Sequence, residues 1–501
     1  MAAGLLKMCV SAGIAAAVVF GRSGEAGHAQ GVLPAGPITF NEHVAPIVFA
    51  NCTSCHRPGE AAPFPLTSFA ETRPMARRIA AVTQAGIMPP WKATPTDYAF
   101  GNARGLTDQQ IAVLQRWVAD GMLEGDRSKL PPLPTFTEGW QLGQPSLVVK
   151  MPDAFEVPAT GPDVYRSFVV PLHLEKDTWV KAVDFRPSAT SVVHHSLFFL
   201  DSTGSARQRD ERDPLPGFAG GMGGGRLRGL AGRGGRAGGA GPSTPLRAGG
   251  AGPDNDVIEQ VGRAAGGGLG GWALGGRALE LPSGLAFFVP KGSDLILSTH
   301  FHPSGRSERE QSTVGFYFAD APPTQAFTGI QLPPAFGLFE GLDIPAGQAR
   351  YTISDSFTLP VDVRAFQVGA HAHYLAKEMK LTATFPAGAT KTLLWIKDWD
   401  FSWQEQYRFK DFVTLPKGTR LDATVSYDNS ASNPRNPSKP PVRVTWGEES
   451  NDEMGSLGLQ VVAANRGELP QLQQAYAQHL RESALSLNGL RGLLRGRGQR
   501  N

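Results

Sequence analysis

The 501-residue chain is poor in cysteine, with only three such residues, and Cys9 lies in an N-terminal leader-like segment. Cys52 and Cys55 are the only thiols beyond it, so a scaffold built on several disulfides is excluded. The charge is also nearly balanced, since 48 basic and 45 acidic residues leave a net charge of +3. This composition indicates no acidic partner such as nucleic acid. After the leader, the chain has no apolar run long enough to span a bilayer.

The first residues resemble an export signal. Lys7 precedes an apolar run from Met8 to Phe20, and the small-x-small sequence Gly27-His28-Ala29 follows. This pattern predicts a signal peptide over residues 1–29, cleaved after Ala29, and a periplasmic or secreted bacterial protein. The alternative is a retained anchor helix, which the run is too short to form because a membrane span needs about 20 residues.

The length suggests about three domains. Residues 38–128 have a helical pattern, in which Thr107 and Gln110 form a capping box ahead of an amphipathic run that begins at Ile111. A cluster of prolines predicts a stiff linker over residues 129–146.

Beyond residue 147 the chain consists of short runs of branched and aromatic residues separated by Pro and Gly, which is typical of β-strands. These runs are Val164–Pro171, Trp179–Phe185, Ser191–Leu200, Leu285–Val289, Leu295–His302, Val314–Phe318, Val363–His373, Met379–Phe385, Leu393–Ile396, Leu421–Tyr427 and Val442–Trp446. They predict two tandem all-β sandwiches, jelly-roll-like, over residues 147–329 and 330–466, with a boundary near Gly329–Pro334.

Two further segments stand out by composition. Residues 204–276 are dominated by Gly, Ala and Arg, which cannot bury enough apolar surface to offset the entropy of ordering. We therefore predict a disordered insertion in the first sandwich; an RNA-binding arginine–glycine segment is the alternative, which export disfavours. Residues 467–501 predict a helical tail with a basic end.

A haem attachment motif lies in the helical region. Cys52-Thr53-Ser54-Cys55-His56 is C-x-x-C-H, in which two thiols bond the haem vinyl groups and the histidine becomes the proximal iron ligand. A redox dithiol and half a zinc site are the alternatives, but a zinc site needs more cysteines than the chain has.

The second iron ligand is expected to be a thioether some thirty residues further on. Met75, Met88 and Met122 all lie in this region. Met88 is held in an extended Met-Pro-Pro loop, whereas the other two fall in helical patterns, where methionine is usually core filler. The motif with Met88 resembles class I cytochromes c, which implies a small all-α cytochrome c domain over residues 38–128. Methionine–histidine ligation implies an iron that carries electrons.

Histidine is scarce as well, with 11 residues, yet six of them lie in three tight groups. The groups are His194 and His195, His300 and His302, and His371 and His373. Metal ligands produce such clustering, whereas histidines satisfied in cores or caps are scattered. The sequence therefore predicts metal sites built from these groups.

The spacing of these residues refines the prediction. His371 and His373 share one face of a strand and can hold one metal together. His194 and His195 are adjacent and point to opposite faces, so for both to bind one ion the strand must end or bulge there. His300 completes that set, while His302 fits either as a ligand or as a supporting residue.

Imidazole suits several metals, and a thioether beside it favours copper. Met454, in Asp452-Glu453-Met454, is a candidate for this thioether ligand. On spacing alone this assignment stays open, because the chain has nine methionines.

Four motifs together resemble the copper type II, ascorbate-dependent monooxygenases, the family of peptidylglycine α-hydroxylating monooxygenase and dopamine β-hydroxylase. They are Val193-His194-His195, Thr299-His300-Phe301-His302-Pro303, His371-Ala372-His373 and Asp452-Glu453-Met454. The resemblance covers residues 147 to 462 in the family's order. It implies two tandem sandwiches and two copper ions. The electron-accepting copper is expected at His194, His195 and His300. The copper that binds O2 and hydroxylates is expected at His371, His373 and Met454.

The chain departs from the peptide-amidating member of the family at two positions. Gly369 replaces an arginine that binds the substrate carboxylate, and Gly458 replaces a tyrosine near the substrate. We therefore do not expect peptide amidation.

The resemblances together predict an exported monooxygenase that hydroxylates a C–H bond of a small organic substrate with O2. Electrons are expected to pass from a redox partner protein or ascorbate, through covalent haem c, to copper. Two alternatives remain: a periplasmic electron-transfer or copper-binding protein without oxygenase activity, and a binding module that has lost its metals.

Overall fold

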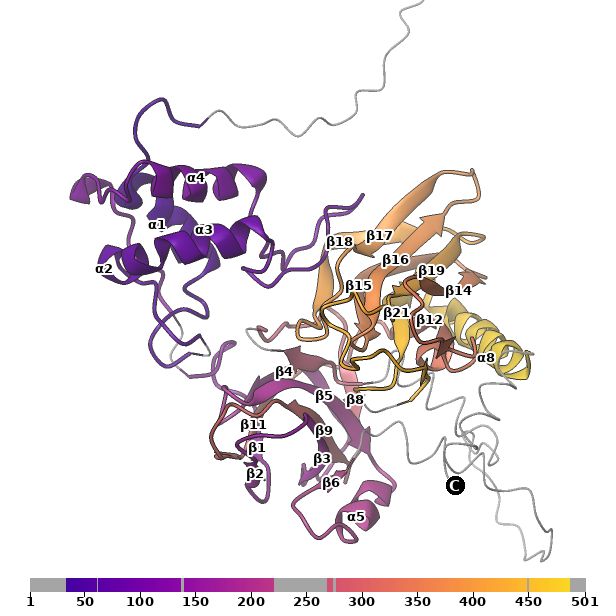
Figure 1. Cartoon of the computed structure of the whole chain (residues 1–501). Coiled ribbons are helices and arrows are strands. Elements are labelled where there is room, and N and C mark those ends of the chain that lie inside the picture. Colours follow the sequence, from indigo (N-terminus) through magenta and orange to yellow (C-terminus); the bar gives the residue numbers. More distant parts are fainter. Residues whose placement is uncertain are drawn as a thin grey trace, which may run out of the picture.

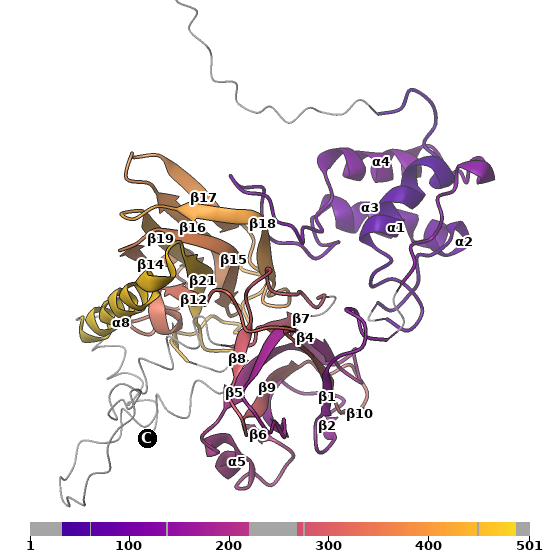
Figure 2. The ribbon, with the colours of Figure 1, turned by 180° about the vertical axis from the view of Figure 1, so that it is seen from behind.

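The computed structural model of the chain describes residues 33–60, 62–136, 139–219, 268–273, 276–447 and 450–486. This part of the chain is mostly β, with several sheets and few helices (Figures 1 and 2). The predicted signal peptide, residues 1–29, lies outside the described residues. Within the described residues, no helix is both long and apolar enough to cross a membrane.

The helices of the N-terminal part form a unit with its own apolar core, which we call the helical unit (residues 38–122). Its elements are the π-helix η1 (Phe40–Val44), α1 (Ala45–Asn51), α2 (Phe69–Thr72), the 3-10 helix η2 (Arg73–Met75), α3 (Ala76–Gln84) and α4 (Asp108–Ala119). Val44 and Val48, beside the cysteines, are fully buried against Trp117 in this core. The predicted capping box of Thr107 and Gln110 is confirmed, and it begins α4.

The predicted helical pattern of residues 38–128 fails between α3 and α4, over a longer stretch than the extended Met-Pro-Pro loop expected at Met88. Residues 91–104, which we call the arm, run in an extended conformation away from the helices and onto the C-terminal β part (Figure 1). Prolines at 89, 90 and 95 explain the failure, because proline lacks the N–H that a helix interior needs. The prolines of the predicted linker, at positions 131, 132, 134 and 145, all follow the 3-10 helix η3 (Arg127–Lys129).

Residues 147–318 form the first β unit. Its strands are β1 (Leu147–Lys150), β2 (Phe155–Val157), β3 (Val164–Pro171), β4 (Thr178–Arg186), β5 (Val193–Asp201), β6 (Phe218–Ala219), β7 (Gly271–Ala273), β8 (Phe287–Val289), β9 (Asp294–Phe301), β10 (Glu308–Glu310) and β11 (Thr313–Phe318). The two larger sheets have the orders β1-β11-β4-β8 and β6-β3-β9-β5-β7. Apolar side chains from both sheets share one core, including Phe185, Phe198 and Phe316.

The predicted disordered insertion, residues 204–276, includes residues that form regular structure. Its first residues form the helix α5 (Ser205–Asp210) and strand β6, and strand β7 lies near its end. Specific contacts hold these edges in place: Ala206 is fully buried, and Asp213 accepts a 2.9 Å hydrogen bond from Arg166. The glycine-rich part, residues 220–267, lies outside the described residues.

Residues 328–485 form the second β unit. Its elements are β12 (Thr328–Leu332), the 3-10 helix η4 (Pro334–Gly337), β13 (Asp343–Ile344), β14 (Tyr351–Thr358), β15 (Val363–Ala372), β16 (Ala376–Thr384), β17 (Thr390–Ile396), β18 (Gln406–Leu415), β19 (Arg420–Tyr427), β20 (Val444–Thr445), β21 (Gly455–Ala463), the 3-10 helix η5 (Arg466–Glu468) and α8 (Leu469–Leu485). The sheets β12-β21-β15-β18 and β14-β19-β16-β17 enclose a second shared core.

One predicted boundary needs correction. Strand β12 pairs with β21, so the change from one unit to the next lies in residues 319–327, before the predicted Gly329–Pro334. The helix predicted in the tail is confirmed as α8, and it is packed, because Leu472, Tyr476 and Leu480 are buried in the second core. Its basic end, residues 487–501, lies outside the described residues.

The arm closes one side of the second β unit by pairing with the edge strands of both of its sheets. Ala93 forms a bridge with Ile396 of β17, and Phe100 forms one with Phe409 of β18. An ion pair between Arg104 and Glu405, with a nitrogen–oxygen distance of 2.6 Å, adds to this contact. The helical unit is therefore attached to the second β unit by backbone pairing as well as by side chains.

Candidate metal centres

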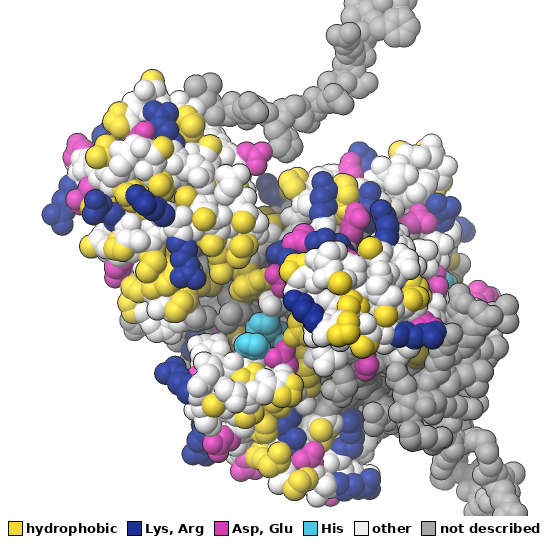
Figure 3. Space-filling view, viewed as in Figure 1, with side chains coloured by type: hydrophobic (Ala, Val, Ile, Leu, Met, Phe, Trp, Pro, Cys, Tyr) yellow, Lys and Arg dark blue, Asp and Glu magenta, His cyan; other side chains and the backbone are white. Residues whose placement is uncertain are grey.

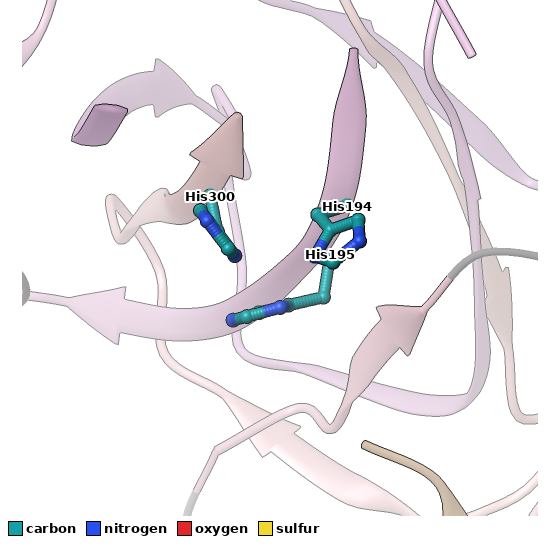
Figure 4. Close-up of side chains that lie close together, drawn as sticks. All are labelled: His194, His195 and His300. Carbon is teal, nitrogen blue, oxygen red and sulfur yellow. The ribbon is translucent and has the colours of Figure 1, made fainter. Parts of the chain in front are cut away.

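The first histidine site consists of His194 and His195 on β5 and His300 on β9. The pairing of these strands shifts register between Val193 and His195, so His194 is the extra residue of a bulge. The bulge required for adjacent histidines to face one ion is therefore confirmed. Figure 4 shows the three side chains close together, carried by neighbouring strands.

The geometry of this site matches a metal-binding set. One nitrogen from each of His194, His195 and His300 lies within 4.8 Å of the other two. The Nδ1 atoms of all three rings are buried, and no described residue forms a hydrogen bond with them. Buried polar atoms are nearly always satisfied. Three unsatisfied nitrogens at one place are thus the arrangement that a bound metal ion would complete.

Burial also prepares these rings for metal binding. It lowers the pKa of His194 to about 4 and lowers the pKa values of His195 and His300. Neutral imidazole is the form that ligates a metal. The three rings are therefore in their ligating form at neutral pH.

Asp163, which no sequence motif marks, contacts His300 and His302 through its carboxylate oxygens. Its Oδ2 atom lies 2.8 Å from Nε2 of His300, and its Oδ1 atom lies 2.8 Å from Nδ1 of His302. Burial opposes ionisation of Asp163, but hydrogen bonds from His300 and Tyr374 outweigh it and hold the pKa of Asp163 well below its ordinary value. His302, with its side chain 64% exposed, thus contacts Asp163 and lies outside the three-histidine set.

The second histidine site lies at the end of β15. The ring centroids of His371 and His373 are 5.4 Å apart. Nδ1 of His371 lies 2.6 Å from Oε1 of Gln404, and Nδ1 of His373 lies 3.1 Å from the carbonyl oxygen of Asp452. Because Nδ1 of His371 contacts Gln404, its Nε2 atom is the nitrogen available to a metal. In the first site, by contrast, the Nδ1 atoms are the ones without a hydrogen bond to a described residue.

Met454 lies beside this pair. Ala372, the last residue of β15, pairs with Gly455, the first residue of β21. Met454 therefore lies across from His373, just beyond this pair. Glu453 joins the two residues, because its Oε2 atom accepts hydrogen bonds from the backbone N–H groups of His373 (3.1 Å) and Met454 (3.0 Å). The structure therefore brings the backbone of Met454 next to that of His373, and its thioether as a metal ligand stays a prediction.

Glu453 is fully buried and belongs to the framework of this site. Its Oε1 atom accepts a further hydrogen bond of 2.5 Å from the backbone N–H of Leu375. Burial raises the pKa of Glu453 to about 8, against the opposing effect of the backbone N–H groups. The side chain fixes the turn after β15 relative to the strand that begins after Met454.

The two histidine sites meet at Phe401. The Phe401 ring centroid lies 5.3 Å from that of His300, 6.0 Å from that of His195 and 5.5 Å from that of His373. One buried aromatic ring therefore contacts both sites. Figure 3 shows histidine side chains in the hollow where the helical unit and the two β units approach one another.

The C-x-x-C-H motif forms a tight turn after α1. The backbone N–H of His56 donates to the carbonyl oxygen of Cys52 (2.9 Å), and Nδ1 of His56 lies 3.0 Å from the carbonyl oxygen of Phe64. The second contact leaves Nε2 as the nitrogen for an iron. Cys52 and Cys55 form no disulfide, and burial raises the pKa of Cys52 to about 12. Both cysteines are thus free thiols.

The methionines of the helical unit differ in their surroundings. Met75 and Met122 pack against its core, as expected of filler residues. Met88 follows α3, and its backbone N–H donates to the carbonyl oxygen of Val82 (3.2 Å). Its role as an iron ligand stays a prediction.

Comparisons with known proteins give little guidance. No family model matches the chain, and no curated protein matches it. A solved structure that is similar is the infectious bursal disease virus VP2 subviral particle, with 8% identity over 65% of this chain and 73% of that chain and a TM-score of 0.17. A similarity this low carries no argument about fold or function.

Proposed function

We propose that this chain is an exported copper monooxygenase that carries a covalently bound haem c. In this proposal the helical unit is a cytochrome c domain, and the two β units are the tandem, jelly-roll-like sandwiches of the copper type II, ascorbate-dependent monooxygenases. The observation that carries the proposal is the cluster of His194, His195 and His300, in which one ring nitrogen of each lies within 4.8 Å of the other two and the Nδ1 atom of each is buried without a hydrogen bond to a described residue. A set of histidines kept only for packing would be hydrogen-bonded.

The residues of both sites fit copper. The first site offers three imidazole nitrogens, and Asp163 fixes the ring of His300 so that Nδ1 faces the ion. The second site offers two imidazoles and the thioether of Met454, and a soft sulfur ligand favours copper over zinc or iron. Bound copper would supply two one-electron carriers and the site at which O2 is activated.

The surrounding residues order the histidine rings. Phe401 is 3% exposed, and its ring contacts His300 of the first site and His373 of the second. Gln404 and Asp452 hold Nδ1 of His371 and of His373, so neither ring turns away from the ion. The reaction inserts one oxygen atom of O2 into a C–H bond and releases the other as water, consuming two electrons and two protons.

The haem motif supplies a source of these electrons. Cys52, Cys55 and His56 lie in one turn, and the contact of Nδ1 of His56 with the carbonyl oxygen of Phe64 leaves Nε2 for an iron, which supports this proposal. A redox partner protein or ascorbate would reduce the haem iron, with Met88 as its second ligand. We propose that electrons then reach the copper at His194, His195 and His300.

The substrate side of the second site is neutral near His371. Gly369 lies two residues before His371 on the same face of β15. A Cβ atom at position 369 would lie 2.6 Å from Oε1 of Gln406, so the Gln406 amide already fills this space. An arginine would not fit there unless Gln406 moved, which supports a small substrate without a carboxylate at this position.

Metal analysis combined with anaerobic reduction tests the proposal. The purified protein is expected to contain two copper ions and one haem, and mixing the reduced protein with O2 is expected to oxidise the haem. A mixture of candidate substrates with isotopically labelled O2 is expected to give a product that contains one labelled oxygen atom.

The variant His371→Ala provides the specific control. It is expected to abolish product formation while the haem absorption spectrum stays unchanged. Unaltered turnover of this variant would refute the assignment. Two coppers with haem oxidation but no labelled product would indicate an electron-transfer or copper-binding protein, and iron without copper would indicate a module that has lost its metals.

A further inference from the structure

Asp163 lies just before β3 and connects the first histidine site to the second β unit. Besides His300 and His302, it accepts a 2.7 Å hydrogen bond at Oδ2 from the hydroxyl group of Tyr374. Tyr374 directly follows His373 of the second site. One carboxylate therefore contacts a first-site ligand and the neighbour of a second-site ligand, across 211 residues of sequence.

The two contacts at Oδ2 have different consequences. Nε2 of His300 is occupied by Asp163, so only Nδ1 of this ring is left to face His194 and His195. The Tyr374 hydroxyl in turn fixes the carboxylate of Asp163. The ring centroid of Tyr374 lies 4.7 Å from that of Phe401, which contacts both sites.

Tyr165 adds a further restraint on His300. The two rings are stacked, with centroids 4.3 Å apart and an interplanar angle of 8°. Stacking is compatible with both orientations of the imidazole that a 180° rotation about its Cβ–Cγ bond interconverts. It therefore does not determine which of the two nitrogens faces His194 and His195. That choice depends on an acceptor at Nε2, and Asp163 is the residue that provides it.

We propose that Asp163 is a positioning residue that selects Nδ1 of His300 as the metal ligand, and that Tyr374 acts on the first site through Asp163. The inference rests on the proposed metal binding at the first site, but it does not depend on oxygenase activity. It means that the geometry of the electron-accepting site depends on the docked second β unit.

Copper affinity measures this directly. Cu(II) is titrated into the full-length protein, depleted of copper, against a competing chelator. The occupied first site is followed by electron paramagnetic resonance. Asp163→Asn is expected to weaken first-site binding by about 10–100-fold, the usual effect of removing the partner of a ligating histidine. The copper hyperfine splitting should change as well, which a purely structural role would not require.

A double-mutant cycle tests the role of Tyr374. Tyr374→Phe keeps the carboxylate and is expected to have a smaller effect, within about tenfold. If Tyr374 acts through Asp163, the double variant should bind copper no more weakly than Asp163→Asn alone. Multiplying effects of the two changes would overturn this part of the inference.

The matched control is Asp97→Asn. Asp97 also links two units, since it accepts a 2.7 Å hydrogen bond from the backbone N–H of Thr392, but it lies in the arm and contacts no histidine. This variant should leave first-site affinity unchanged. If Asp163→Asn and the unmodified protein bind copper at the first site with equal affinity, the inference about Asp163 is refuted and the proposed function stands. If the unmodified protein binds no copper, both the inference and the proposed function are refuted.

Discussion

Removal of the Glu453 carboxylate is expected to damage the second site and the second β unit together. In Glu453→Ala, the backbone N–H groups of His373, Leu375 and Met454 lose the acceptor that they share. A buried donor left without a partner costs about 1–3 kcal/mol. Three of them, partly relieved by water entering the space, give an expected loss of about 3–5 kcal/mol in the free energy of unfolding.

Urea unfolding of the metal-free protein, followed by tryptophan fluorescence, measures this loss. Copper analysis of the same variant should show one ion in place of the two proposed for the unmodified protein, because His373 and Met454 are no longer fixed together. Glu378→Ala is the control, since Glu378 lies on β16 and accepts a hydrogen bond from the Trp395 side chain at a half-buried position. Loss of less than about 1 kcal/mol, with both coppers retained, would show that Glu453 does not hold the site.

Three further changes have defined outcomes. Gln404→Ala removes the contact that fixes His371 and should weaken second-site copper binding by about tenfold in a chelator competition, with the first site unaffected. Burial and the charge of Asp355 raise the pKa of Glu340 to about 7, so its folded form holds a proton that the unfolded chain loses near pH 4.5. Stability from this group is therefore present at pH 4.5 and lost as the pH rises through 7, and Glu340→Gln should flatten the unfolding free energy over that range. Arg104→Met leaves the half-buried Glu405 without its partner, and it should lower the thermal midpoint of the second β unit more than Arg420→Met at the exposed Asp422 pair, as measured by calorimetry.

Local sequence patterns predicted much of the fold. The strands Val164–Pro171 and Val314–Phe318 were located within one residue, because alternating branched and aromatic residues define one buried face. The strand Tyr351–Thr358 was missed, because Asp355, with its side chain only 12% exposed, interrupts the inward-facing row of Ile353 and Phe357. The strand Gly455–Ala463 was missed because two glycines interrupt its pattern.

The site was predictable where its ligands are neighbours in sequence. The adjacent His194 and His195 required a bulge, and the bulge is present. The framework residues could not be found in this way, because Asp163 and Gln404 contact histidines 137 and 33 residues away, and no motif marks either of them. Such residues become visible only when strand pairing places them beside a ligand.

The arm connects the helical unit to the segment of the second β unit that contacts both histidine sites. It begins three residues after Met88, the proposed iron ligand, and it ends at Arg104, whose partner Glu405 directly follows Gln404. Lys92 in the arm approaches Asp400, the neighbour of Phe401, with a nitrogen–oxygen distance of 3.5 Å. The segment that holds His371 and contacts His300 is therefore the same segment on which the helical unit is docked. The docking of the helical unit and the geometry of both histidine sites thus depend on one short stretch, residues 400–405, and substitutions there should affect the docking and both sites at once.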